Sequence, residues 1–246
     1  MRGIDSFPSP LVLHSLFLRP SLLTPYPSPV SDLQSSRTKL DRYPARGKHD
    51  LATVAAILDE GFFCHVGFVK NGQPFVIPTG YGRKDRMLYL HGSAASRMLT
   101  EAGKGIALCV TVTLVDGLVL ARSAFHSSVN YRSVVILGTA EPVGAHEKVA
   151  ALRTISDHIV PGRWEGLRPV KQEEIDQTTV LKLDIVEASA KVRSGPPVDD
   201  EEDYALPIWA GTLDLAAPVA TPNPDKRLLP GVAVPAHVMR YRRIRS

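Results

Sequence analysis

"FFCHVGFVKNGQPFVIPTGYGR", residues 62–83, decides the fold of this 246-residue chain. Two runs rich in β-branched and aromatic residues flank Asn71-Gly72, a pair that favours the tight turn of a β-hairpin because both residues tolerate a positive φ. In the second run Pro78 cannot donate a hydrogen bond to a neighbouring strand, so it marks a sheet edge or a bulge. The stretch therefore predicts antiparallel pairing.

The segments around the hairpin continue this pattern. Asp50 is placed to cap a helix over residues 51–60 that ends at Gly61, and apolar spacing predicts further helices over 93–102 and 146–160. Further strands are expected over residues 87–92, 106–115, 118–125, 131–143 and 179–193. Short connections join most of these strands, which favours an antiparallel α+β barrel over a doubly wound parallel sheet.

Proline content marks the domain boundaries. Six of the 20 prolines lie in residues 1–35 and eight follow Gly195. We expect a disordered N-terminal extension over 1–36, one domain over 37–215, and a proline-rich, basic tail over 216–246. The first segment is a poor signal peptide, because "SPLVLHSLFLRP" breaks its apolar run with a histidine; an over-extended gene start explains it better than a transit peptide.

Composition excludes several classes of protein. No apolar run reaches eighteen residues, so we expect no membrane span. The net charge of +4 includes four arginines in the last eight residues, and without interleaved aromatic residues these do not predict nucleic-acid binding. The two cysteines, Cys64 and Cys109, lie in apolar segments, which suits a reducing, cytoplasmic compartment. Cys64 and His65 are neighbours on a strand and point to opposite faces, so no metal site is expected.

The string "HGSAASR", residues 91–97, follows a predicted strand. A helix that starts at Ser93 would leave the amides of Ala95 and Ser96 without intrahelical partners, and such amides favour phosphate. Arg97 adds a planar, fixed charge. The alternative is an ordinary N-cap at Ser93.

A second polar string, "ARSAFHSSVNYRS", residues 121–133, separates two strands. Its polar residues could line a site, with an arginine near a reduced cofactor and His126 as proton donor. The alternative is a surface loop. Residues 78–81 likewise either offer backbone groups to a ligand or form a bulge.

Four segments together resemble the pyridoxamine 5′-phosphate oxidase-related flavoproteins, in the branch of the nitroimidazole-reductase-like proteins. These segments are residues 43–83, 88–99, 110–143 and 161–164, and the resemblance spans about residues 37–215. It implies a six-stranded antiparallel split β-barrel, a homodimer, and FMN held at the subunit interface, with Ser96 and Arg97 on its phosphate. Met98 stands where true oxidases have a lysine, and the C-terminal segment that binds pyridoxal phosphate is missing.

The sequence therefore predicts an FMN-dependent oxidoreductase acting on a small molecule, with NAD(P)H as a candidate electron donor. The alternatives are a non-catalytic flavin-binding protein for storage or sensing, and a barrel that holds haem or a deazaflavin. His126 is the candidate catalytic residue, and the candidate cofactor-binding residues are Pro78, Thr79, Tyr81, His91, Gly92, Ser93, Ser96, Arg97, Arg122, Ser123, Asn130 and Arg132.

Overall fold

The predicted hairpin is present in the computed structural model, which describes residues 33–215 and 220–241 of the chain. Strand β2 (Phe63–Lys70) pairs with β3 (Gln73–Lys84), with Lys70 opposite Gln73. Asn71 and Gly72 have φ values of 51° and 77°, as the turn requires. The hairpin prediction is confirmed.

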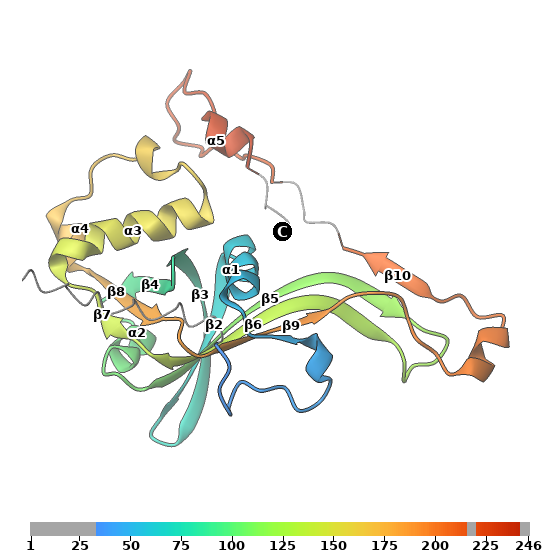
Figure 1. Ribbon diagram of the computed structural model, residues 1–246. Coiled ribbons are helices and arrows are strands. Elements are labelled where there is room, and N and C mark those ends of the chain that lie inside the picture. The colour runs from blue at the N-terminus through green and yellow to red at the C-terminus, as the bar shows by residue number, and fades with distance from the viewer. Residues whose placement is uncertain (1–32, 216–219, 242–246) are drawn as a thin grey trace, which may run out of the picture. The chain divides into compact units, whose positions relative to one another are not determined.

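The other strands extend this hairpin into a large antiparallel sheet (Figure 1). The hydrogen-bonded order is β1-β9-β6-β5-β2-β3-β4-β8-β7, and β10 pairs with the end of β5. The strands besides the hairpin are β1 (Gly47–Lys48), β4 (Met87–Ser93), β5 (Ala107–Leu120), β6 (Ser128–Thr139), β7 (Glu141–Pro142), β8 (Thr178–Asp184), β9 (Ala188–Arg193) and β10 (Gly211–Asp214).

The predicted α+β class is confirmed, but the described residues form ten strands where six were expected. The difference comes in part from β1, β7 and β10, which have two to four residues each. The hydrogen-bonded path does not return to its first strand, so closure into a barrel stays a prediction. Only Ala140 separates β6 from β7, so the chain itself links the last strand of the path to an inner one.

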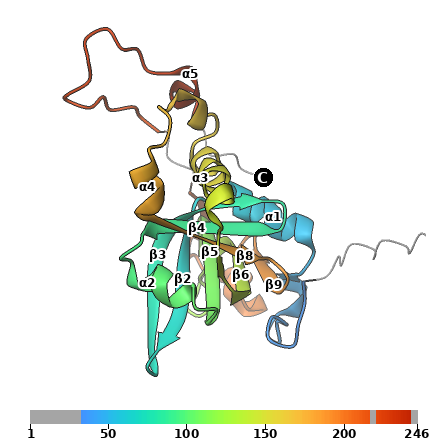
Figure 2. The same cartoon turned by 90° about the vertical axis from the view of Figure 1, so that its left-hand side faces the viewer.

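Five α-helices and three short 3-10 helices accompany the described part of the sheet. They are α1 (Leu51–Glu60), α2 (Arg97–Ala102), α3 (Ala145–Ile159), α4 (Gln172–Asp176), α5 (Ala236–Met239), η1 (Pro44–Arg46), η2 (Trp164–Gly166) and η3 (Glu201–Ala205). The predicted cap of α1 is confirmed, because Asp50 Oδ1 accepts a hydrogen bond from the Thr53 amide at 2.8 Å. In both views α3 lies above the strands (Figure 1, Figure 2). A side chain at Gly82 would lie 2.6 Å from the Ile155 Cα, so this glycine is what lets α3 approach β3.

Two strand predictions were wrong in their extent. Residues 106–115 and 118–125 were expected as separate strands, whereas β5 runs on to Leu120 with a bulge between Val115 and Gly117. Residues 179–193 were expected as one strand, whereas β8 pairs with β4 and β9 pairs with β6. Because the two halves have different neighbours, the chain must bend between them, and Ile185 there donates its amide to the Arg86 carbonyl at 2.8 Å.

The proposed N-terminal boundary also needs correction. Leu33 is 1% exposed, its amide donates to the His49 carbonyl at 2.9 Å, and its carbonyl accepts from the Ala188 amide at 3.0 Å. Residues 33–36 therefore belong to the fold. The rest of the predicted extension lies outside the described residues, as do 216–219 and 242–246 of the predicted tail.

The two faces of the sheet differ. One face carries the core, with Cys64, Val66 and Val110 fully buried. On the other face Phe63, Val69, Val76 and Val115 are each more than half exposed. Below, these four residues and His65 between them are called the open face. Cys64 is buried and His65 exposed, as strand alternation predicted. None of the described helices is long and apolar enough to span a membrane.

Candidate functional site

The turn between β4 and α2, residues 91–97, differs from its prediction. Strand β4 pairs with β8 as far as Ser93, and the helix begins only at Arg97, with Ser96 as its N-cap. The predicted helix start at Ser93 was therefore wrong. The amides expected to be free are also engaged, since Ala95 donates to Ser93 Oγ at 3.2 Å and Ser96 to the Ser93 carbonyl at 2.9 Å. Gly92 lies within β4, where a side chain would approach the Leu99 side chain to 3.1 Å.

The polar groups that remain at this turn lie on side chains. Arg97 is exposed, its guanidinium carbon lies 4.6 Å from the centre of the Phe75 ring, and no carboxylate in the described part of the chain pairs with it. His91 Nδ1 is buried without a hydrogen-bond partner, and burial lowers the pKa of this imidazole. The turn thus presents one unpaired cation and one imidazole nitrogen that can still form a hydrogen bond.

In the segment 78–81, the first three residues lie at the edge of the sheet and Tyr81 lies in the core. Residues 73–80 of β3 pair with β2 only, because β4 begins to pair at Tyr81. Pro78 therefore marks a sheet edge, and the alternative of a bulge was wrong since the register is continuous. Thr79 is half-buried and donates its hydroxyl to the Gly80 carbonyl at 3.3 Å. Tyr81 is fully buried and donates its hydroxyl to the Leu58 carbonyl at 2.6 Å, so its side chain supports the core rather than a ligand.

The polar string 121–133 has partners within the chain. Arg122 donates its amide to Asp199 Oδ1 at 2.9 Å and Nη1 to Oδ2 at 3.0 Å, and the Asp199 side chain is fully buried. Asn130 Oδ1 accepts from Arg193, while Asn130 Nδ2 donates to the Gly195 carbonyl at 3.1 Å. Residues 193–199 therefore hold Arg122 and Asn130 in place, although Arg122 Nε is buried without a hydrogen-bond partner, and their predicted role in cofactor binding stays a prediction.

Ser123 and His126 also form local contacts. Ser123 Oγ accepts the His126 amide at 3.2 Å, which shapes the loop. His126 Nε2 lies 3.3 Å from Asp200 Oδ2. The role of His126 as proton donor stays a prediction.

Arg132 occupies the centre of an ion network. Its guanidinium donates to Glu60 Oε1 at 2.9 Å and to Asp116 Oδ2 and Oδ1 at 2.9 and 2.8 Å. The Glu60 side chain is 5% exposed, and the hydrogen bonds from Asp116 and Glu60 raise the pKa of Arg132 further above its usual range. Arg132 therefore joins α1, β5 and β6, and its predicted role as a cofactor-binding residue stays a prediction.

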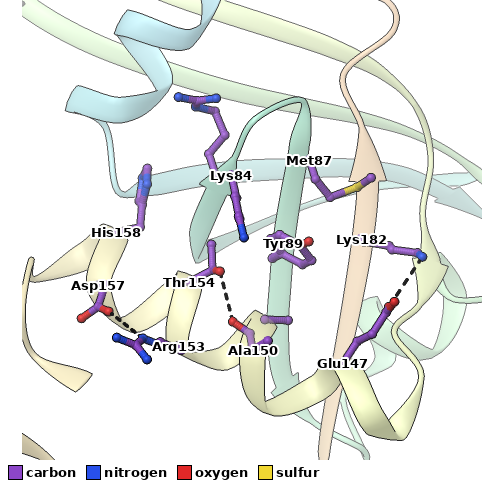
Figure 3. A pocket seen from close by; sticks show the side chains of 12 residues that line it. Lys84, Met87, Tyr89, Glu147, Ala150, Arg153, Thr154, Asp157, His158 and Lys182 are labelled. Atoms are coloured by element: carbon purple, nitrogen blue, oxygen red, sulfur yellow. Dashed lines mark hydrogen bonds and ion pairs between the residues drawn. The ribbon is translucent and has the colours of Figure 1, made fainter. Parts of the chain in front are cut away.

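The described part of the chain contains two large pockets, of which only the second includes a predicted site residue. A cleft of about 840 Å³ lies between α3 and strands β3, β4 and β8, and none of the predicted site residues lines it (Figure 3). Its charges are largely paired, with Arg153 Nε 3.6 Å from Asp157 Oδ2 and Lys182 Nζ 3.9 Å from Glu147 Oε2. The second pocket, of about 680 Å³, lies where the 121–128 loop meets residues 42–46, and His126 lines it.

Arginines from distant parts of the sequence line this second pocket, which is called the arginine pocket below. They are Arg42, Arg46 and Arg193. The string "RYPAR", residues 42–46, was the one local signal, a tyrosine between two arginines. Nothing local marked Arg193, which joins them only through the pairing of β9 with β1 and β6. Across the described ranges, no group of three or more His, Cys, Asp or Glu side chains could hold a metal ion.

Comparison with known proteins adds to this geometry. The sequence profile of the family described as pyridoxamine 5′-phosphate oxidase matches residues 50–192. The structure is similar to that of the flavocytochrome Anf3 from Azotobacter vinelandii, with a TM-score of 0.80, 46% identity, and coverage of 85% of this chain and 97% of that one. It is also similar to an FAD and haem binding protein from Mycobacterium smegmatis, with a TM-score of 0.77, 33% identity, and coverage of 79% and 96%. A comparison with curated proteins gave no match.

The ion network yields the first prediction. Arg132→Ala should lower the free energy of unfolding by about 3–5 kcal/mol, because it removes the guanidinium that forms an ion pair with the buried Glu60 carboxylate. Denaturant titration measures this change, and Arg168→Ala, which removes an exposed arginine from an ion pair with Glu174, should leave stability nearly unchanged. Unaltered stability of Arg132→Ala would contradict the structural role assigned to this residue.

Proposed function

The chain belongs to the pyridoxamine 5′-phosphate oxidase-like family of flavin-binding split-barrel proteins, and we propose that it is a redox protein that binds both a flavin and a haem. One observation carries the proposal: two relatives that the chain matches over almost their whole length are described as a flavocytochrome and as an FAD and haem binding protein. The sequence alone implied FMN. The proposal widens this to a flavin, with FAD as the first candidate, and favours the haem-binding alternative over a purely flavin-dependent enzyme.

The β4–α2 turn fits the phosphate of a flavin. Arg97 has no carboxylate partner in the described ranges, and its stacking on Phe75 holds the planar guanidinium at the surface. Ser93 and Ser96 add hydroxyl groups on either side of two exposed alanines, which leave room for a ligand to approach. The tasks of this chain's residues are to bind and orient the flavin, whereas a bound flavin supplies two-electron chemistry and exchange of single electrons.

The open face fits a haem. A haem needs an axial ligand beside apolar surface, and histidine is a common one. His65 is the one described histidine that is exposed on a strand, and the Phe63 ring lies 6.3 Å from its ring in an edge-on arrangement. By contrast, His49 and His158 are half-buried, the first just before α1 and the second in the last turn of α3. We therefore assign the iron ligand to His65.

The open face also supports the predicted homodimer. Four large apolar side chains more than half exposed on one sheet face are unusual for a surface that stays in water. A second copy of the chain is the partner that the proposal places there, with the cofactors between the subunits. A small-molecule substrate and NAD(P)H as electron donor remain part of the proposal.

The absorption spectrum tests the function. Purified protein supplied with haem and flavin should show a haem Soret band together with flavin absorption, and a deazaflavin would give a different spectrum. His65→Ala should lose the Soret band and retain flavin, while His146→Ala, which changes a histidine whose side chain is 85% exposed at the start of α3, should keep both. Flavin absorption without haem uptake by the unaltered protein would rule out the haem half of the proposal.

Flavin affinity tests the phosphate turn. Arg97→Ala removes a charge-assisted contact worth about 1.5–3 kcal/mol, which corresponds to roughly ten- to hundredfold weaker binding of FMN or FAD. Ser96→Ala should cost less, about 0.5–1.5 kcal/mol, because its hydroxyl is neutral. Riboflavin, which lacks the phosphate, is the control and should respond little to either change. Equal FMN affinity in Arg97→Ala and the unaltered protein would remove this assignment.

Light scattering tests the dimer. The cofactor-loaded protein should have the mass of two chains even when dilute. Val76→Lys places a charge on the open face and should shift the mass toward one chain, whereas Leu229→Lys, at a side chain that is 73% exposed away from the sheet, should not. A flavin-loaded monomer would show that the open face has another purpose.

A further inference from the structure

The arginine pocket carries more positive than negative charge, because three arginines line it together with Asp199, which pairs with Arg122, and Asp200. Its volume of about 680 Å³ is in the range of small-ligand sites. Arg42, Arg46 and Arg193 line it, and among residues 33–215 and 220–241 none of the three lies within ion-pair distance of a carboxylate. These arginines come from the segment before β1 and from the end of β9, so long-range folding brings them together.

The two carboxylates in the pocket wall are committed elsewhere. Asp199 is fully buried and bonds to Arg122, at 2.9 and 3.0 Å. Asp200 faces His126 at 3.3 Å. The arginines therefore repel one another. Burial is the main cause that lowers the pKa of Arg193, and the nearby positive charge of Arg46 lowers this pKa further. A bound anion would relieve this repulsion.

Aromatic rings complete the pocket. Tyr43 lies between Arg42 and Arg46, whose guanidinium carbons are 5.1 and 4.4 Å from its ring centre. Phe125 is 88% exposed, and its ring meets the His126 ring edge-on at a centroid distance of 5.1 Å. Exposed rings beside guanidinium groups are the elements that hold a nucleobase and its phosphates.

We propose that the arginine pocket binds an adenosine diphosphate group, with the diphosphate on the arginines and the base against Phe125 and Tyr43. The inference rests on the proposed function in one respect: FAD and NAD(P)H both carry this group, and FMN does not. A guanidinium presents parallel N–H donors that match phosphate oxygens, and several arginines in one small pocket suit a diphosphate better than a single carboxylate.

This pocket is separate from the phosphate turn. The turn follows β4, which lies between β3 and β8, and β2 and β5 separate these strands from β6 and β9 (Figure 1). The pocket lies at the ends of β6 and β9. Because the two phosphates of FAD are adjacent, the two sites of one chain cannot hold the same FAD, so a flavin on the turn and an adenosine diphosphate group in the pocket belong to two molecules.

ADP itself is the first probe. The unaltered protein should bind ADP in calorimetric titration, and adenosine at least about tenfold more weakly. The double variant Arg42→Ala/Arg46→Ala should lose at least about tenfold in ADP affinity. The matched control, Arg153→Ala/Arg168→Ala, removes the same charge from exposed arginines outside the pocket and should bind ADP normally.

Two further variants separate the recognition elements. Arg46→Lys keeps the positive charge but loses the parallel N–H donors of the guanidinium, so this variant should bind ADP more weakly than the unaltered protein does. Phe125→Ala should weaken ADP but leave pyrophosphate binding unchanged, since it removes only the ring. Thermal melting shows that each variant is folded, and Phe125, being 88% exposed, is not needed for the core.

Binding of the whole cofactors shows whether FAD or NAD(P)H supplies the adenosine diphosphate group. If FAD is the carrier, FAD binds more tightly than FMN and the double variant abolishes the difference. If NAD(P)H is the carrier, FAD and FMN bind alike and NADPH displaces ADP. Absence of ADP binding, or equal ADP affinity in the double variant, overturns the inference even if flavin binds; ADP binding in a protein that takes up no flavin would instead overturn the proposed function.

Discussion

The ion network around Arg132 fixes the geometry on which the candidate sites depend. Arg132 on β6 reaches Glu60 at the end of α1 and Asp116 in the bulge of β5. The bulge shifts the register of β5 against β6 between Val115 and Gly117, and from Gly117 onward β5 also pairs with β10. A buried carboxylate and arginine are costly to separate, so the network resists any change in the direction of β5. The loop at 121–128, which forms one wall of the arginine pocket, starts where this fixed strand ends.

The two faces of the sheet differ in exposure and in the side chains that they carry. The inner face is apolar and closed, and burial raises the pKa of the Cys64 thiol to about 12, so this cysteine remains a neutral thiol that cannot act as a nucleophile near neutral pH. The open face carries exposed apolar residues and His65 instead.

Local patterns predicted those elements whose causes are local. The Asn71-Gly72 turn, the Asp50 cap and helix α3 each follow from a few adjacent residues, and the structure confirms them. The errors arose where distant pairing decides the outcome. Strand β4 extends to Ser93 because Thr178 pairs with it, which displaces the start of α2 to Arg97.

For the site residues, too, contacts with residues distant in the sequence decided whether a polar side chain is available. Arg122 and Arg132 look available in the sequence, because their carboxylate partners lie 77 and up to 72 residues away. Arg97 remains available because no acidic residue in the described part of the chain folds back to it. The sequence therefore identifies the polar residues but does not show which of them form hydrogen bonds or ion pairs within the folded chain.

The distribution of acids explains why the arginine pocket stays positive. The segment after β9 carries the acidic run Asp199–Asp203, enough negative charge to neutralise its surroundings. Yet Asp199 is directed into the core of the loop, where Arg122 takes both of its oxygens, and the aromatic ring of Tyr204 lies 4.8 Å from the same guanidinium. This arrangement uses an acid to anchor the 121–128 loop against residues 199–204, and thereby keeps that acid away from Arg42, Arg46 and Arg193. The same contacts that order the loop thus leave the pocket with unpaired cations, which is the electrostatic condition that an anionic ligand requires.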